Sequence, residues 1–185
     1  LPENLGFISA EIENGNFDLG IVVDPDVDRL CFINQDGTFF GEEYTLVAIA
    51  KYVLENKKGN TVSNLSSTRA LRDVTEKLGG EYHAAAVGEV NVVTKMKEVN
   101  AVIGGEGNGG VIYPELHYGR DALVGIALFL SYLAKFGKPI SFLRTTLPSY
   151  NISKNKIELT PDINVKEVLA FIKDKYKLRP INTID

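Results

Sequence analysis

The sequence predicts an α/β fold whose main part is a three-layer α/β/α domain. The first observation is that short β-branched runs alternate with segments of helical period between Gly41 and Leu147, which is typical of strands and helices that alternate along a chain. The second is the composition of the 185 residues, of which 44% are hydrophobic and 24% are charged. That balance is typical of an ordinary globular protein with a sizeable core.

A hairpin is expected ahead of this domain. Residues 1–17 carry few periodic apolar positions and several turn formers, and we expect them to be the tail of a preceding domain. Ile21–Val23 is a β-branched run before a turn signal, so it predicts a buried strand between helical layers. A second strand is expected at Leu30–Asn34, with a tight turn at Gln35–Gly37 and a return strand at Thr38–Phe40.

From Glu42 the period becomes helical. We expect this helix to carry its apolar residues on one face and to end in a basic last turn, with Gly59 as its stop. Asp121 precedes an apolar run and is expected to cap a helix that reaches about Phe136. The elements between these two helices are, in chain order, a strand at Thr61–Leu65, a helix at Thr68–Leu78, a strand at Glu81–Val87, a helix at Val90–Val99 and a strand at Ala101–Gly104.

The pattern changes after the domain. Pro148–Asn155 has the composition of a linker, and a strand is expected at Ile157–Leu159. Asn164 and Glu167 form a capping-box pattern before a helix with one apolar face. We therefore expect a further unit to begin here. Because the chain also starts without a methionine, we expect it to be a piece of a longer protein.

Composition excludes several classes of protein. A formal net charge of -4 without a basic stripe argues against a nucleic-acid partner. The longest apolar run, Ala122–Leu130, is far shorter than the roughly 20 residues of a membrane span, and no signal-peptide pattern is found. Cys31 is the single cysteine, so a disulfide framework is impossible and a cytoplasmic location is expected.

The loop after the first strand carries Asp24, Asp26 and Asp28 in alternation. In an extended loop, alternate side chains point the same way, so the three carboxylates would converge on one point and need a cation between them. Oxygen ligands favour Mg²⁺, with Ca²⁺ and Mn²⁺ as alternatives. Arg29 adds a fixed cation that suits a phosphate. A simply solvated acidic turn is the other interpretation of these residues.

A second loop, Gly104–Gly110, places five glycines around Glu106 and Asn108. We expect the glycines to allow a ligand to approach the backbone closely, and not to be required by packing. The side chains of Glu106 and Asn108 would then be accessible to that ligand. A dinucleotide site is excluded because the loop leads into Val111–Pro114 instead of a helix. A plain glycine-rich turn remains the alternative.

Both loops resemble those of a known family. The D-x-D-x-D-R loop at Asp24–Arg29 and the loop around Glu106 resemble the metal-binding and sugar-binding loops of the α-D-phosphohexomutases, which include phosphoglucomutase, phosphomannomutase and phosphoglucosamine mutase. The resemblance implies a mixed sheet and partial neighbouring domains. It divides the chain into residues 1–40, the C-terminal part of domain 2 with the metal loop; residues 41–147, domain 3 with the sugar-binding loop; and residues 148–185, a linker and the start of domain 4.

The resemblance also implies an activity. Members interconvert hexose 1-phosphate and hexose 6-phosphate, of glucose, mannose or glucosamine, through a phosphoserine, a hexose bisphosphate and Mg²⁺. The phosphoserine would lie upstream, so no catalytic residue is expected in this fragment, and the fragment alone would be inactive. Its partners would be the sugar phosphates and domains 1 and 4 of the same polypeptide, with no nucleic acid and no membrane.

The resemblance assigns roles to individual residues. Asn108 stands where many members have serine, Glu89 where many have a histidine facing the substrate, and Ser66 where some have a lysine. Arg120 would meet a phosphate or lie in solvent near a helix cap. The full assignment gives Mg²⁺ to Asp24, Asp26 and Asp28, and substrate contacts to Arg29, Glu106, Asn108, Glu89 and Arg120.

Two rival functions are left open. A phosphatase of the haloacid dehalogenase type also places a D-x-D motif after a strand, and Leu65–Ser67 would imitate its second motif. Its later lysine and acidic pair are not found in the sequence. The second rival is a non-catalytic module that binds a metal or a sugar phosphate.

Overall fold

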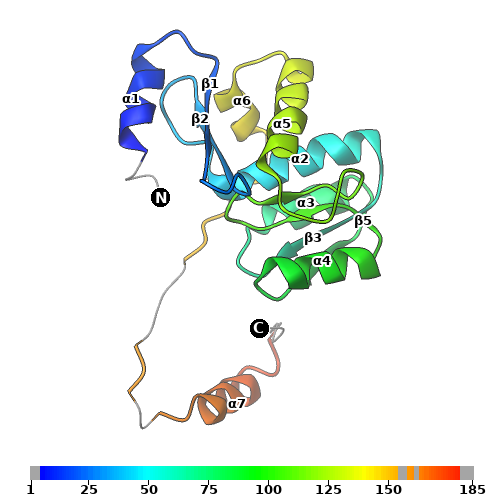
Figure 1. The fold of residues 1–185 in the computed structure, drawn as a ribbon. Coiled ribbons are helices and arrows are strands. Elements are labelled where there is room, and N and C mark those ends of the chain that lie inside the picture. Colours follow the sequence, from blue (N-terminus) through cyan, green and yellow to red (C-terminus); the bar gives the residue numbers. More distant parts are fainter. Residues whose placement is uncertain (1–4, 154–157, 161–162, 180–185) are drawn as a thin grey trace. The chain divides into compact units, whose positions relative to one another are not determined.

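The computed structural model describes residues 5–153, 158–160 and 163–179 of the chain. The described residues belong to two units, Leu1–Asn151 and Ile152–Asp185, and each unit is treated by itself. The larger unit holds every element that the following paragraphs place around the candidate site. The smaller unit holds one helix (Figure 1).

The larger unit begins with helix α1, Gly6–Asn14, followed by an antiparallel hairpin of β1, Leu19–Val23, and β2, Leu30–Asn34 (Figure 1). Helix α1 was not among the predicted elements. Only Ile12 of this helix is buried, and its side chain packs against Gly20 in β1. A long-range contact of one residue leaves no periodic pattern in the sequence.

The strand predicted at the start of the hairpin is present, but it is not buried. Ile21 is 38% exposed and Val23 is 40% exposed. The reason is that β1 belongs to a sheet of two strands and pairs only with β2, so it has no helical layer on each side. The predicted turn is confirmed, because Gly37 has a φ of 76° and donates its N–H to the carbonyl of Asn34. The return strand predicted at Thr38–Phe40 is wrong, since this segment forms only an isolated bridge between Phe39 and Ile33.

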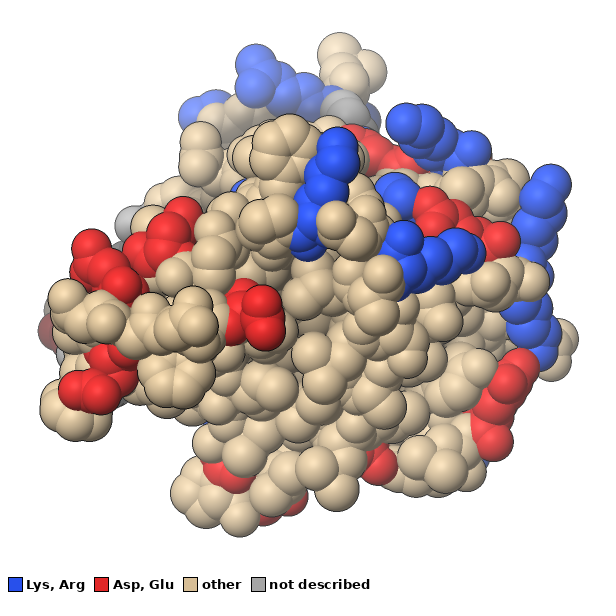
Figure 2. Space-filling view, turned by 90° about the horizontal axis from the view of Figure 1, so that it is seen from above, with Lys and Arg blue, Asp and Glu red and all other residues tan. Residues whose placement is uncertain are grey.

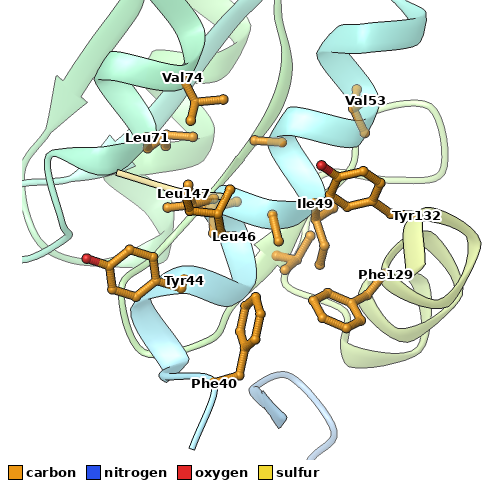
Figure 3. Packing of buried hydrophobic residues seen from close by; sticks show 14 of the residues in the cluster. Phe40, Tyr44, Leu46, Ile49, Val53, Leu71, Val74, Phe129, Tyr132 and Leu147 are labelled. Atoms are coloured by element: carbon orange, nitrogen blue, oxygen red, sulfur yellow. The ribbon is translucent and has the colours of Figure 1, made fainter. Parts of the chain in front are cut away.

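Helix α2, Glu42–Asn56, is the central helix of the unit. It packs against β2 and α5 on one side and against α3 and β5 on the other, so its residues are buried nearly all round rather than on one face (Figure 3). The predicted basic last turn is wrong, since the helix ends at Asn56 and Lys57 already has extended backbone. Gly59 is needed for space, because a Cβ there would lie 2.4 Å from Val102 Cγ1.

The main sheet has four strands in the order β4-β3-β5-β6. Strands β4 and β5 run parallel to the central β3, and β6 runs antiparallel to β5. The sheet is therefore mixed, as predicted. The bounds are β3, Asn60–Asn64; β4, Tyr82–Ala85; β5, Ala101–Gly105; and β6, Val111–Ile112.

Helices cover both faces of this sheet and complete the three layers. Helix α3, Ala70–Lys77, lies with α2 over one face, and helix α4, Glu89–Glu98, buries Val92 and Met96 against the other (Figure 1). The predicted α/β/α architecture is confirmed. The predicted strands and helices of this part agree with the structure to within about two residues at each end.

Helix α5, Ala122–Phe136, connects the hairpin to the three-layer part. Phe129 of α5 stacks on Phe32 with ring centroids 3.8 Å apart and meets Phe40 edge-on at 5.2 Å. Figure 3 shows Phe129 of α5 and Phe40, which lies just before α2, close to each other beside α2. The short helix α6, Ile140–Thr145, was not predicted, and Gln35 of the hairpin turn holds it through two hydrogen bonds to Ser141, at 2.8 and 3.3 Å.

The smaller unit holds helix α7, Val165–Lys175, with Asn164 as the predicted N-cap that accepts the N–H of Glu167. The predicted strand Ile157–Leu159 begins outside the described residues, and Glu158 and Leu159 are not in a strand. In the described ranges, no helix is long and apolar enough to span a membrane. On the face of the molecule in Figure 2, mostly acidic side chains lie along the left and lower edges, basic side chains with some acidic ones among them lie along the upper and right edges, and a wide uncharged area lies between.

Candidate functional site

The acidic loop lies between β1 and β2 and is a tight turn, not an extended segment. Val27 donates its N–H to the carbonyl of Asp24 at 3.0 Å and has a φ of 57°. The expectation that an extended backbone brings the three carboxylates together is therefore wrong. The carboxylates nevertheless lie close to one another. One carboxylate oxygen from each of Asp24, Asp26 and Asp28 lies within 4.8 Å of the other two.

Asp24 is held as a carboxylate by the residues that follow it. Its Oδ1 accepts the backbone N–H groups of Asp28 and Arg29 at 3.1 and 3.0 Å, and its Oδ2 accepts Nε of Arg29 at 2.5 Å. Burial alone would raise the pKa of Asp24, but the hydrogen bonds from Arg29 and Asp28 lower it well below its usual range. Asp24 therefore stays ionised at neutral pH.

The other two aspartates differ in their surroundings. Burial and the neighbouring carboxylates raise the pKa of Asp28, although the Arg120 guanidinium opposes this. Oδ1 of Asp28 is buried and has no hydrogen-bond partner among the described residues. Asp26 is exposed, and its carboxylate forms no hydrogen bond or ion pair with the described part of the chain. The three carboxylates converge, Asp26 is exposed and Oδ1 of Asp28 lacks a hydrogen-bond partner among the described residues, which fits a hard divalent cation such as Mg²⁺.

The glycine loop joins β5 to β6, and its glycines are explained by protein packing, contrary to our expectation. A Cβ at Gly109, whose φ is 89°, would lie 2.2 Å from the carbonyl oxygen of Leu30. A Cβ at Gly110 would lie 2.5 Å from Cδ of Arg120, and one at Gly107 would lie 2.9 Å from the carbonyl oxygen of Ser66. The close approach is to other segments of the chain, so these positions require glycine even without a ligand.

The two loops, far apart in the sequence, lie against each other. Leu30, at the end of the acidic loop, donates its N–H to the carbonyl of Gly109 at 3.2 Å. The start of α5 also holds the acidic loop, because Ala122 donates its N–H to the carbonyl of Val27 at 3.0 Å. The structure therefore brings the metal-loop and sugar-loop residues of the sequence prediction into one site.

Within the glycine loop, only one of the two polar side chains is presented to solvent. Asn108 is exposed, and its Oδ1 accepts the N–H of Gly110 at 3.1 Å. Glu106 is only 3% exposed. Its Oε1 accepts Nδ2 of Asn64 at 2.7 Å and the N–H of Gly88 at 3.3 Å. The expectation of a presented Glu106 is wrong in this structure, because three donors, one of them Arg120, hold its carboxylate inside.

Arg120 is neither solvent-exposed nor free. Its side chain is 21% exposed and forms ion pairs with three carboxylates. Nη1 donates to Oε2 of Glu106 at 2.6 Å, and Nη2 pairs with Oδ2 of Asp28. Nε lies 3.6 Å from Oε2 of Glu89, while Oε1 of Glu89 accepts the backbone N–H of Arg120 at 3.0 Å. A phosphate contact of Arg120 stays a prediction; its partners in the structure are carboxylates.

Sequence reasoning did not single out two contributors to the site. Asn64 is buried at the carboxyl end of β3 and holds both Glu106 and Ser67, accepting the Ser67 hydroxyl at 2.7 Å. Its position at the end of a parallel strand is the signal that would have found it. The second is His117, whose Nε2 lies 2.9 Å from Oδ2 of Asp121. The spacing of four residues between His117 and Asp121 can be seen in the sequence. Such a spacing occurs often by chance, so it does not by itself predict a contact.

Comparison with known proteins agrees with the fold. The family model for phosphoglucomutase/phosphomannomutase, alpha/beta/alpha domain III, matches residues 41–150, more than half of the chain. A probable phosphoglucosamine mutase of Methanopyrus kandleri is 32% identical over 187 residues, which cover 100% of this chain and 41% of that protein. A phosphoglucomutase/phosphomannomutase of Thermococcus kodakarensis is 34% identical over 161 residues, which cover 86% of this chain and 35% of that protein.

Solved structures give the same result. A phosphoglucomutase/phosphomannomutase family protein of Burkholderia thailandensis superimposes with a TM-score of 0.73 at 30% sequence identity. The match covers 80% of this chain and 33% of that one. The chain thus spans well under half the length of the relatives that it matches.

Proposed function

The chain belongs to the phosphoglucomutase/phosphomannomutase family, and from this premise we propose that it is part of a phosphohexomutase that interconverts hexose 1-phosphate and hexose 6-phosphate. The observation that carries the proposal is the contact between the acidic loop and the glycine loop, which places three convergent aspartates beside a polar loop. The names of the relatives include glucosamine, glucose and mannose phosphates, so the proposal covers these three hexoses.

In this proposal, Asp24, Asp26 and Asp28 hold Mg²⁺, which supplies positive charge for a phosphoryl group in transfer. Arg29 binds a phosphate oxygen of the substrate. The structure favours this role for Arg29 because its side chain is 51% exposed. Its guanidinium donates a hydrogen bond to Asp24 through Nε, which leaves the two terminal nitrogens available. An anchored guanidinium can offer its terminal nitrogens to a phosphate with little loss of entropy.

The sugar would bind over the glycine loop. Asn108 is exposed and offers an amide to the hydroxyl groups of the ring. The buried Glu106 fixes the conformation of the loop from below through Asn64, Gly88 and Arg120. A direct contact of Glu106 with the sugar would need one of these donors to move.

The phosphoryl donor is proposed to be a phosphoserine in another part of the polypeptide. The bond between its phosphorus and the serine oxygen breaks as a hydroxyl oxygen of the hexose phosphate forms a new bond to phosphorus. The proton of that hydroxyl group passes to the serine oxygen, so the products are the free serine hydroxyl and the hexose bisphosphate. The other phosphate then returns to the serine, and the second product leaves. The 185-residue chain by itself should therefore show no turnover.

The structure does not favour the phosphatase alternative. In that class the nucleophilic aspartate follows a strand of a parallel sheet, whereas β1 pairs antiparallel with β2 in a sheet of two strands. The non-catalytic module is tested together with the mutase by the experiment below.

The test uses the complete polypeptide that contains this chain. We expect Mg²⁺-dependent conversion of at least one of the 1-phosphates of glucose, mannose and glucosamine into its 6-phosphate, with a hexose bisphosphate as primer. Chelation by EDTA should stop the reaction, and Asp26→Asn should reduce it strongly, while Asp18→Asn, an exposed aspartate just before β1, should not. Release of inorganic phosphate instead of isomerisation would contradict the proposal, and binding without any conversion would favour the non-catalytic module.

A further inference from the structure

We propose that Arg120 is a positioning residue that joins the acidic loop and the glycine loop, so that the metal site and the sugar site are built as one unit. The inference rests on the proposed function for the identity of the two ligands. It differs from a phosphate-binding role, because it predicts that Arg120 acts through other residues and not by touching the substrate.

The first support is that Arg120 connects segments that no other described side chain connects. Its guanidinium pairs with Asp28 in the acidic loop, with Glu106 in the glycine loop and with Glu89 at the start of α4. Each of these three residues comes from a different part of the sequence. One planar, permanently charged group with several N–H donors can serve separate carboxylates at once, which a lysine ammonium does less well.

The second support is that the backbone and stem of Arg120 are themselves fixed. Arg120 forms an isolated antiparallel bridge with Ile112 of β6, and the next residue, Asp121, donates its N–H to the carbonyl of Val111 at 2.9 Å. The aliphatic stem crosses Gly110 so closely that a Cβ there would lie 2.5 Å from Cδ. A guanidinium on such a stem has little freedom to turn towards a ligand.

The third support is the cost of leaving the carboxylates without it. Glu106 is buried, and Arg120 is its only ion-pair partner in the described part of the chain. Asp28 already has one buried oxygen without a hydrogen-bond partner among the described residues. Without Arg120, two largely buried carboxylates would repel each other across the contact between the loops. The loops would then have to move apart, and both sites would be distorted together.

The experiment measures the two binding events separately, in the complete polypeptide and without turnover. Mn²⁺ binding is followed by electron paramagnetic resonance without sugar phosphate, and glucosamine 1-phosphate or glucose 1-phosphate binding by calorimetry in EDTA. We expect Arg120→Gln to weaken both affinities by about 10- to 100-fold, the range found when residues that orient metal ligands are changed. Arg72→Gln, on a half-exposed arginine of α3 paired with the adjacent Asp73, is the control and should change neither affinity.

Arg120→Lys keeps the positive charge, and it tests the inference even if Arg120→Gln does not fold. We expect it to melt close to the wild type and still lose affinity for both ligands, by a smaller factor. Loss of sugar-phosphate affinity alone would show that Arg120 binds phosphate, and unchanged affinities for both would show no role; either result overturns the inference. A wild-type protein that binds neither ligand would overturn it too. A wild type that binds both ligands without isomerising them would refute the proposed function and leave the inference standing.

Discussion

Nη1 of Arg120 lies 2.6 Å from Oε2 of Glu106, and the glutamate is almost completely buried. The acid that the sequence marked as a sugar ligand is thus also the innermost part of a charged cluster. Its second oxygen accepts Asn64 and the backbone of Gly88. The pair therefore ties the stability of the glycine loop to the geometry of the candidate site.

We predict that Glu106→Ala lowers the free energy of unfolding by about 3–5 kcal/mol, because it leaves the guanidinium of Arg120 and the amide of Asn64 without their acceptor. Urea denaturation followed by circular dichroism measures this loss. Glu106→Gln, which keeps an acceptor oxygen, should cost less. Glu98→Ala, at an exposed pair in α4, is the control and should stay within about 0.5 kcal/mol of the wild type. Equal stability of Glu106→Ala and the control would contradict the prediction.

Mg²⁺ should stabilise the folded protein through the acidic loop. At a concentration of about 100 times the dissociation constant, a ligand that binds only the folded state adds about 2.7 kcal/mol. We expect a rise in melting temperature with Mg²⁺ in the wild type and in Asp18→Asn, and a strongly reduced rise in Asp26→Asn. Asp26 suits this test because its exposed carboxylate makes no contact that the fold of the described residues needs. A full Mg²⁺ response in Asp26→Asn would remove it from the metal ligands.

The stacked pair of Phe32 and Phe129 should carry much of the attachment of the hairpin to the three-layer part. Phe129→Ala removes a fully buried ring and leaves a cavity between α5, β2 and Phe40, for which we expect a loss of about 3–5 kcal/mol in the free energy of unfolding. Phe142→Ala, at an exposed ring of α6, should cost less than about 1 kcal/mol. Urea denaturation measures both losses. Equal losses of stability in Phe129→Ala and Phe142→Ala would contradict the prediction.

Gly109→Ala should separate the two loops. Its backbone is left-handed, and the added Cβ would meet the carbonyl of Leu30, the residue whose N–H bonds to the carbonyl of Gly109. We expect a clearly lower melting temperature together with faster hydrogen exchange at the N–H of Leu30. Gly6→Ala is the matched control, since a Cβ at Gly6 meets no atom within 4 Å. Unchanged hydrogen exchange at the N–H of Leu30 would show that the contact between the two loops accommodates the added Cβ, and would contradict the prediction.

The cap of α5 gives a pH-dependent prediction. Burial alone would raise the pKa of Asp121, but the hydrogen bonds from the Val124 N–H and from His117 outweigh it, so the pKa is lowered from its ordinary 3.8. A lowered folded-state pKa means that the ionised cap stabilises the fold above pH 3.8, and that this contribution is lost as the pH falls through the folded value. We expect Asp121→Ala to cost about 1 kcal/mol at pH 7.

The same difference in stability should shrink when the pH falls below 3.8. Asp121→Asn keeps an acceptor oxygen for the cap and should retain most of the stability at pH 7. Urea denaturation of the three proteins at several pH values measures these effects. A pH-independent difference between the wild type and Asp121→Ala would contradict the assignment.

Features that depend on neighbours along the chain could be predicted from the sequence. The alternation of strands and helices, the cap at Asp121 and the cap at Asn164 are local patterns, and the structure confirms them. The absence of a strong local pattern explains why helices α1 and α6 were not predicted. Helix α1 depends on one buried residue, Ile12, and helix α6 on contacts that include Gln35, far from it in the chain.

By itself, the sequence determined the alternation of strands and helices between Gly41 and Leu147, the α/β/α architecture and the two loops that carry polar side chains. Only the tertiary structure decided that these loops touch, that Glu106 is buried, that the glycines serve packing and that Arg120 has three carboxylate partners. The physical reason is that periodicity and capping arise from contacts within a few residues. Burial and charge pairing arise from segments that meet only when the sheet, the hairpin and α5 are assembled.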